Sequence, residues 1–221
     1  MAVKELWILR HGQATHNPRA EAAREAGCSM EEFLELMRQD DSLDSELTPL
    51  GKQQAEAVSQ STKQNSLDLV VSSPLSRAIQ TADIAVPHVE NRVVYEGFRE
   101  INGLLLNAKR RTKTDLANRF PHWNVDHIDE EDELWTPALE FWKDCGARGY
   151  EGLQWLLQRP EEKILLVAHG GILRETMALH VEMRDDRKNQ DRSVDGRFSN
   201  CELRRYRLEE DTKVVLTELD Y

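Results

Sequence analysis

Residues 163–171, "KILLVAHGG", decide the fold of this chain. An uninterrupted apolar run from Ile164 to Ala168 ends in a histidine and two glycines. Such a run suits a strand that is covered on both faces, as in a parallel sheet with helices on either side. The stretch 67–73, "LDLVVSS", has the same character. The two stretches together predict an α/β domain with a largely parallel central sheet.

Short aliphatic runs alternate with longer segments of helical period along the rest of the chain. We predict strands at residues 5–10, 67–72, 92–96, 163–168, 202–208 and 213–219. We predict helices at about residues 49–64, 74–84, 113–119, 137–158 and 172–180. Thr48 before Pro49, and Ser73 before Pro74, each have the order of an N-cap followed by a first-turn proline. The pattern predicts a single domain over residues 1–221, built as a three-layer α/β/α sandwich.

Two segments interrupt this alternation. Residues 18–46 are expected to form a helical insertion, in which Ser29 follows a helix break and caps a second helix. Residues 102–136 are expected to form a cap-like insertion. Its acidic and aromatic stretch 121–135 is predicted to be an irregular loop that its tryptophans hold in place.

Composition narrows the classes of partner. The 221 residues include 29 Lys and Arg against 40 Asp and Glu, which gives a net charge of −11 and argues against a nucleic-acid partner. No apolar run is long enough to span a membrane, the first residues do not resemble a signal peptide, and the three cysteines are far apart. We expect a cytoplasmic protein without a membrane partner. A local basic pocket can still attract a small anion.

Four polar clusters follow predicted strands, where open α/β sheets bind their ligands. They are Arg10-His11-Gly12, Arg77 in the first turn of a helix, Glu100, and His169-Gly170-Gly171. Each cluster alone has an ordinary structural explanation, such as a cap, a surface charge or a turn. The carboxyl ends of parallel strands meet at one edge of a sheet, so the four together predict an anion-binding site.

Five segments, in order from residue 7 to about residue 175, resemble the histidine phosphatase superfamily, also called phosphoglycerate mutase-like. They read "LRHGQATHN", "LTPLGKQQAEA", "SSPLSRAIQTA", "REINGL" and "VAHGGILRE". The Arg-His-Gly triplet alone is weakly specific, whereas its combination with the "SSPLSRAIQTA" string and the distal His169-Gly170-Gly171 is very specific. The resemblance implies phosphoryl transfer without a metal or another cofactor.

The resemblance also implies a role for each polar cluster. His11 would attack phosphorus and become phosphorylated, which requires a neutral imidazole whose other nitrogen is held, for example by a backbone carbonyl near Gly12. Arg10, Arg77 and His169 would surround the phosphoryl oxygens, with His169 as a cation because a neighbouring phosphate raises the pKa of an imidazole.

Glu100 would donate a proton to the leaving oxygen and then accept one from water. The family's acid commonly follows a Leu-x-Glu order, and this chain has Phe98-Arg99-Glu100 instead. Glu96 is a competing carboxylate four residues earlier, and we prefer Glu100.

Several further residues are expected to contact the phosphoryl group or the substrate. The resemblance places Asn17 and Thr15 there, and the amide of Asn17 can donate a hydrogen bond to a phosphoryl oxygen. Gly12, Gln13 and Gly170 are expected beside the pocket, Gln13 as a pocket wall and Gly170 where backbone approaches an anion. The basic stretch 107–116 contains Arg110 and Arg111. It is either a solvated face or a source of cations for a second acidic group of the substrate.

Three functions remain open at this point. The first is a phosphatase acting on a small phosphorylated metabolite, the second a cofactor-dependent phosphoglycerate mutase, and the third a non-catalytic scaffold or phospho-ligand-binding member. Dedicated mutases have sequences similar to "RHGxSxWN" followed by a short stretch. In this chain His16 replaces the tryptophan of that pattern, and a helical insertion follows. The scaffold is disfavoured because all five chemically important residues are present. We therefore expect a phosphatase, and a homodimer is an open alternative because dimers are common in the superfamily.

Overall fold

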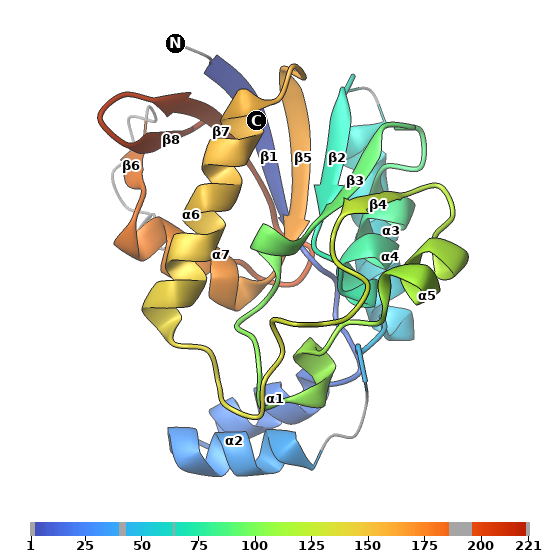
Figure 1. The fold of residues 1–221 in the computed structure, drawn as a ribbon, viewed down its shortest axis with the longest axis vertical. Helices are drawn as coiled ribbons and strands as arrows, with labels where there is room; N and C mark the ends of the chain where they lie inside the picture. The colour runs from blue at the N-terminus through green and yellow to red at the C-terminus, as the bar shows by residue number, and fades with distance from the viewer. Residues whose placement is uncertain (1–2, 40–42, 64, 186–195, 220–221) are drawn as a thin grey trace.

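The computed structural model describes residues 3–39, 43–63, 65–185 and 196–219 (Figure 1). One eight-stranded sheet runs through it in the order β4-β3-β2-β5-β1-β7-β8-β6. The strands are β1 Val3–Arg10, β2 Leu69–Ser72, β3 Arg92–Tyr95, β4 Asn124–His127, β5 Lys163–Ala168, β6 Glu182–Asp185, β7 Leu203–Glu210 and β8 Val214–Glu218. All neighbouring pairs are parallel except β1 with β7 and β7 with β8. The predicted α/β class and the mostly parallel sheet are confirmed.

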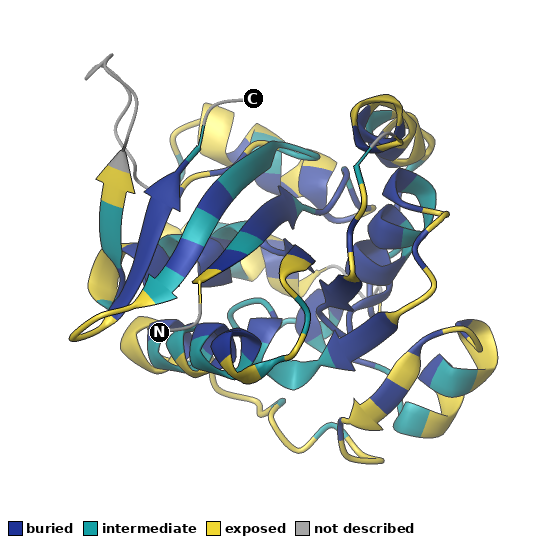
Figure 2. Ribbon diagram, turned by 90° about the horizontal axis from the view of Figure 1, so that it is seen from above, coloured by how far each residue is buried: buried dark blue, intermediate teal, exposed yellow. Residues whose placement is uncertain are grey.

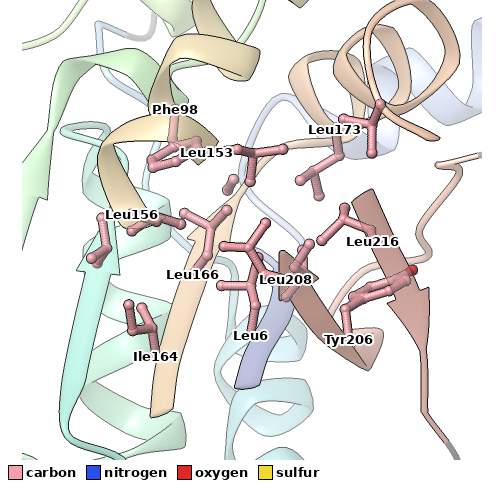
Figure 3. Close-up of a cluster of buried hydrophobic side chains, with 14 of the residues drawn as sticks. Leu6, Phe98, Leu153, Leu156, Ile164, Leu166, Leu173, Tyr206, Leu208 and Leu216 are labelled. Atoms are coloured by element: carbon pink, nitrogen blue, oxygen red, sulfur yellow. The ribbon is translucent and has the colours of Figure 1, made fainter. Parts of the chain in front are cut away.

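Helices cover both faces of this sheet, as the alternation of residues along β1 requires. The helices are α1 Asn17–Glu25, α2 Met30–Arg38, α3 Pro49–Thr62, α4 Ser76–Ala85, α5 Lys113–Arg119, α6 Trp142–Gln158 and α7 Gly170–Leu179, with 3₁₀ turns η1 Glu96–Phe98 and η2 Leu106–Ala108. Leu6 and Ile8 belong to the apolar core under α6 and α7, which Figure 3 shows in close-up. Trp7 and Leu9 belong to the core under α3 and α4. Figure 2 shows the buried central strands between these helical layers.

An arm made of α1 and α2 leaves the sheet directly after β1. Figure 1 places the arm beyond the carboxyl ends of β2 and β5. Its ends are joined, because Ala14 bridges Leu47 and the N–H of Thr15 donates to the carbonyl of Glu46 at 2.9 Å. The predicted cap at Ser29 is confirmed, with a reciprocal bond pair to Glu32. Residues 40–42 of the expected insertion 18–46 lie outside the described residues, as does Gln64 at the end of the predicted helix 49–64.

Two predicted helix starts need correction. Thr48 caps α3 as expected, but Ser73 does not cap α4, which begins at Ser76. The N–H and hydroxyl of Ser76 instead donate to the buried carboxylate of Asp44, at 2.8 and 2.5 Å. A carboxylate from another element therefore satisfies this helix start.

The helix predicted over residues 137–158 begins only at Trp142. The backbone groups of the preceding residues form hydrogen bonds with the segment that follows Glu100. The N–H of Glu140 donates to the carbonyl of Asn102 at 2.8 Å, and the carbonyl of Thr136 accepts from Leu104 at 2.8 Å. These bonds hold residues 136–140 outside a helix.

Sequence reasoning missed the two edge strands of the sheet. β4 lies within the stretch 121–135 that was predicted to be irregular, and only Val125 of its residues is buried. β6 pairs with β8 at the opposite edge. Neither strand carries an apolar run, because an edge strand packs against fewer neighbours. None of the helices in the described ranges is long and apolar enough to cross a bilayer.

Candidate active site

The register of the central strands brings two histidines together. β1 and β5 are parallel with Arg10 opposite Ala168, so the next residue of each strand, His11 and His169, leaves the sheet at the same level. Their ring centroids lie 4.9 Å apart. The adjacent strand β2 adds Ser73, whose hydroxyl lies 2.7 Å from Nε2 of His169. Segments about 60 to 160 residues apart in the chain therefore meet at one edge, as parallel pairing predicts.

The imidazole of His11 is held in one tautomer. Its Nδ1 lies 2.7 Å from the carbonyl oxygen of Gly12, which can only accept, so Nδ1 carries the proton and Nε2 is left with a lone pair. The side chain is buried. Burial lowers the pKa of His11 well below its ordinary value, and the charges of Arg77 and Arg10 lower it further. The ring is therefore neutral at neutral pH, as a nitrogen nucleophile requires.

The loop that carries His11 is fastened to the neighbouring helices. The N–H of Gly12 donates to Oγ1 of Thr81 in α4 at 3.0 Å. A Cβ at Gly12 would lie 2.5 Å from the carbonyl oxygen of Gly51 in α3, so the close approach requires glycine. The Oε1 of Gln13 accepts from the hydroxyl of Thr48 at 3.0 Å. Gln13 thus anchors the loop to α3, and its expected place as a pocket wall stays a prediction.

Arg10 and Arg77 place two guanidinium groups around the histidines. Each donates one hydrogen bond to a backbone carbonyl, Arg10 to Phe198 at 2.6 Å and Arg77 to Asn107 at 2.7 Å. Their Nε groups are buried and have no acceptor among the described residues. Burial lowers the pKa of Arg77 to about 10, so it remains charged at neutral pH. Buried guanidinium nitrogens with unused donors indicate an anionic ligand.

The carboxylate of Glu100 lies at the amino end of α7. It accepts from the N–H groups of Ile101 at 2.8 Å, Gly171 at 3.0 Å and Ile172 at 3.0 Å. A Cβ at Gly171 would overlap Oε1 of Glu100, so glycine permits this contact. The side chain is half-buried, and its negative charge acts on both Arg10 and Arg77. Glu100 is therefore held beside the same cluster.

Glu96, the competing carboxylate, is hydrogen-bonded to Arg99 and Arg110. Its Oε1 accepts from Arg99 at 2.6 Å and its Oε2 from Nε of Arg110 at 2.8 Å. Arg148 of α6 braces the intervening segment, donating to the carbonyls of Arg99 at 2.9 Å and Glu100 at 3.3 Å. This arrangement favours Glu100 over Glu96 as the reactive acid.

The surroundings of His169 favour its neutral form, and the cationic form expected beside a bound phosphate stays a prediction. Burial lowers the pKa of His169 well below its ordinary value, and the charge of Arg77 lowers it further. The imidazole is fully buried and two arginines lie near it, so its neutral form is favoured. The sequence shows the histidine but not the depth at which it is buried.

The remaining predicted residues lie in different environments. Asn17 is buried at the start of α1, where its Oδ1 accepts from the N–H of Ala14 at 2.8 Å and its Nδ2 lies 3.3 Å from Nε2 of His16. Thr15 is exposed. A Cβ at Gly170 would lie 3.4 Å from Nε of Arg10, so Gly170 borders the cluster at the start of α7.

Arg110 corrects both interpretations of the basic stretch 107–116. It is neither a solvated cation nor a group reaching over the pocket, because its side chain is buried and ion-paired to Glu96. It also donates to the carbonyls of Asp129 at 2.9 Å and Glu131 at 2.7 Å. Arg111 is partly exposed, and its Nε lies 3.4 Å from the carboxylate of Asp44. Arg110 therefore holds the expected cap-like insertion together.

This arrangement predicts the effect of replacing Arg110. We expect Arg110→Met to lower the free energy of unfolding by about 3 kcal/mol, since the half-buried carboxylate of Glu96 and several carbonyls lose their donor. The KM for phosphate esters should stay unchanged. Chemical denaturation and steady-state kinetics measure the two quantities. The control is Lys113→Gln, whose 4.0 Å pair with exposed Asp126 contributes little. A raised KM with unchanged stability would instead place Arg110 at the substrate.

Several anchoring residues were not identified from the sequence. Ser73 and Thr81 stand inside the quoted string 72–82, where their hydroxyls were a readable signal. Asn107, Phe198 and Asn200 have no such signal. The first two act through backbone carbonyls, and the third donates to the carbonyl of His11 at 3.0 Å from a distant loop.

No cluster of three or more His, Cys, Asp or Glu side chains is placed to hold a metal ion within the described ranges. The three cysteines are free thiols. The arrangement offers a neutral nitrogen nucleophile, two guanidinium groups and a carboxylate within one cluster. This combination is suited to phosphoryl transfer, in which charge on the phosphoryl oxygens must be stabilised.

Comparison with known proteins agrees with this arrangement. The sequence model of the histidine phosphatase superfamily (branch 1) matches residues 6–220. The chain is 31% identical over 237 residues to Phosphoglycerate mutase-like protein 1 of Arabidopsis thaliana, which covers 91% of this chain and 79% of the relative.

Solved structures share the fold at lower identity. A mycobacterial glucosyl-3-phosphoglycerate phosphatase aligns with a TM-score of 0.58 at 22% identity, covering 99% of this chain and 98% of the other. The ecdysone phosphate phosphatase of Bombix mori aligns with a TM-score of 0.59 at 17% identity, covering 99% and 92%. The superfamily match and the relatives support a phosphatase or mutase enzyme. The chain belongs to the histidine phosphatase superfamily.

Proposed function

We propose that this protein is a phosphatase that hydrolyses a small phosphorylated metabolite through a phosphohistidine on His11, with Glu100 as general acid and base. One observation carries the proposal. The bond from Nδ1 of His11 to the carbonyl of Gly12 leaves a neutral Nε2 beside two arginines that have unused donors. A neutral nucleophile and unpaired buried cations are what the attack on a phosphate ester needs.

The first chemical step transfers the phosphoryl group to the protein. Nε2 of His11 forms a bond to phosphorus while the bond from phosphorus to the ester oxygen breaks. Glu100, in its protonated form, gives its proton to that oxygen, which leaves as an alcohol. Arg10 and Arg77 donate to the phosphoryl oxygens throughout the step.

The second step returns the protein to its starting state. The carboxylate of Glu100 takes a proton from water as the water oxygen bonds to phosphorus. The bond between phosphorus and Nε2 of His11 breaks, which releases inorganic phosphate and a neutral imidazole. His169, hydrogen-bonded to Ser73, becomes a cation while a phosphate is bound, because the anion reverses the unfavourable charge environment.

Hydrolysis is favoured over mutase activity by the segment after Asn17. The sequence pattern of dedicated mutases has a tryptophan at the position of His16. A short stretch follows in that pattern, whereas α1 and α2 follow in this chain. A mutase must retain the phosphoryl group and return it to its product. Glu100, the proposed base for water, is only half-buried, which allows water to reach it.

An assay separates the two reactions. The protein is incubated with 3-phosphoglycerate and 2,3-bisphosphoglycerate, and both 2-phosphoglycerate and free phosphate are followed over time. We expect phosphate release to exceed isomerisation, because water is the acceptor in the second step. Rapid isomerisation with little phosphate release would establish a mutase. A parallel phosphate-release screen over sugar phosphates, phosphoglycerates, nucleotides and phosphopeptides narrows the substrate class.

A further inference from the structure

A second group of unused donors lies beside the proposed phosphate site, at the start of the α1–α2 arm. Its first member is His16, which is buried and whose ring centroid lies 6.3 Å from that of His11. The Oδ1 of Asn17 accepts from Ala14, so the Asn17 group that faces His16 is the amide donor Nδ2, 3.3 Å from Nε2. Because Nε2 is the acceptor in this pair, the neutral ring carries its proton on Nδ1.

That Nδ1–H group has no acceptor among the residues that the structure describes. A buried donor without an acceptor costs on the order of 1–3 kcal/mol, so its persistence points to a ligand that satisfies it. Burial lowers the pKa of His16 well below its ordinary value, and positive charges that include Arg24 lower it further. The ring is therefore a neutral donor.

The second member is Arg24, seven residues after Asn17 on the same helix. Seven residues are nearly two helical turns, so both lie on one face of α1. The guanidinium carbon of Arg24 lies 5.1 Å from the centroid of the Phe33 ring, which supports one face of the group. The edge of a stacked guanidinium remains available to an anion.

The positive charges around His16 are not ion-paired with carboxylates among the residues that the structure describes. Arg10, Arg24 and Arg77 form no ion pair with any carboxylate in the described ranges, although the chain has 40 acidic residues. The positive charge of Arg24 acts on Arg10 as well as on His16. Glu21 of the same helix acts on Arg10 with the opposite sign. The charge of exposed Arg24 therefore acts on both Arg10 and His16, which places its guanidinium near the proposed phosphate site.

We propose that Arg24 and Nδ1–H of His16 form a subsite for a second anionic group of the substrate. The substrate class is then a phosphomonoester that also carries a carboxylate or another acidic group. This inference rests on the proposed phosphatase function and assigns the specificity to α1. It replaces Arg110, whose guanidinium is engaged elsewhere, as the cation for that second group.

The test compares two substrates that differ in the second acidic group. 3-Phosphoglycerate carries a carboxylate, and glycerol 3-phosphate carries a hydroxymethyl group in its place. The measured quantity is the ratio of their kcat/KM values, obtained from phosphate release. We expect Arg24→Gln to lower this ratio about tenfold, mainly through the KM for 3-phosphoglycerate. Arg24→Lys should keep part of the preference, because it retains the charge but not the planar fork.

Arg19 provides the matched control on the same helix. It is exposed, and its guanidinium contacts the carbonyl of Leu36 at 3.5 Å. Arg19→Gln should leave the ratio unchanged. If Arg24→Gln also leaves the ratio unchanged while the unmodified protein hydrolyses both esters, the subsite is overturned and the phosphatase function stands. If the unmodified protein releases phosphate from no ester, the proposed function itself is overturned.

Discussion

Replacing His11 with alanine should abolish hydrolysis of phosphomonoesters, with kcat falling by at least about 10³-fold. The reason is that no neighbouring group can take its place. Nε2 of His11 is the nitrogen that the Gly12 contact leaves unprotonated, whereas Nε2 of His169 is engaged with Ser73. The same variant should lose all acid-labile phosphate labelling after incubation with a radiolabelled ester. Rapid acid quench followed by gel analysis measures the label.

A control separates loss of chemistry from loss of fold. His88 is exposed and lies between α4 and β3, at the amino edge of the sheet. His88→Ala should retain both turnover and labelling. Circular dichroism of His11→Ala should show an intact fold, because the backbone bonds of this loop do not depend on the imidazole. Acid-labile label on His11→Ala would reject His11 as the nucleophile.

Replacing Glu100 with glutamine should produce the second largest effect. We expect turnover of alkyl phosphates to fall roughly 10²- to 10⁴-fold, because the amide can neither protonate the leaving oxygen nor take a proton from water. An ester with a good leaving group, such as p-nitrophenyl phosphate, needs less help in the first step. With that substrate a burst of p-nitrophenol should accompany the accumulation of phosphohistidine.

Glu96→Gln is the informative comparison for this experiment. Glu96 holds Arg99 and Arg110, so its replacement should lower stability without causing the phosphorylated protein to accumulate. Stopped-flow bursts and quantified phosphohistidine distinguish the two variants. The assignment of Glu100 fails if its variant turns over alkyl phosphates at the normal rate, or if only Glu96→Gln accumulates the intermediate.

The sequence predicted the centre of the fold better than its edges. Central strands such as β5 are covered on both faces, so their residues must be apolar and the run is visible. The edge strand β4 buries only Val125, and its Asn and Asp residues resemble a loop. The start of α4 was misplaced for a related reason. Ser73 has the right residue type for a cap, but Asp44, far away in the chain, satisfies the helix start instead.

For the site, sequence could indicate which side chains meet but not how each is partnered. Parallel strands deliver their following residues to one edge, so His11 and His169 could be paired from pattern alone. Burial is a property of the whole fold, which is why the depth at which His169 lies was not foreseen. The burial of Arg110 and its ion pair with Glu96 could not be predicted, because the sequence shows a charge without its partners. Every residue has a backbone carbonyl whatever its side chain, so the contacts from the carbonyls of Phe198 and Asn107 could not be predicted from residue type.

Those carbonyl contacts have a consequence for biosynthesis. The carbonyl of Phe198, the side chain of Asn200 and the N–H of Cys201 all bind the backbone or side chain of Arg10 and His11. A nascent chain that has emerged only as far as residue 180 already contains the nucleophile, both guanidinium groups and the acid. It lacks the contacts from residues 198–201 that hold Arg10 and His11 in place. The proposed site is therefore completed only after residues 198–201 have left the ribosome.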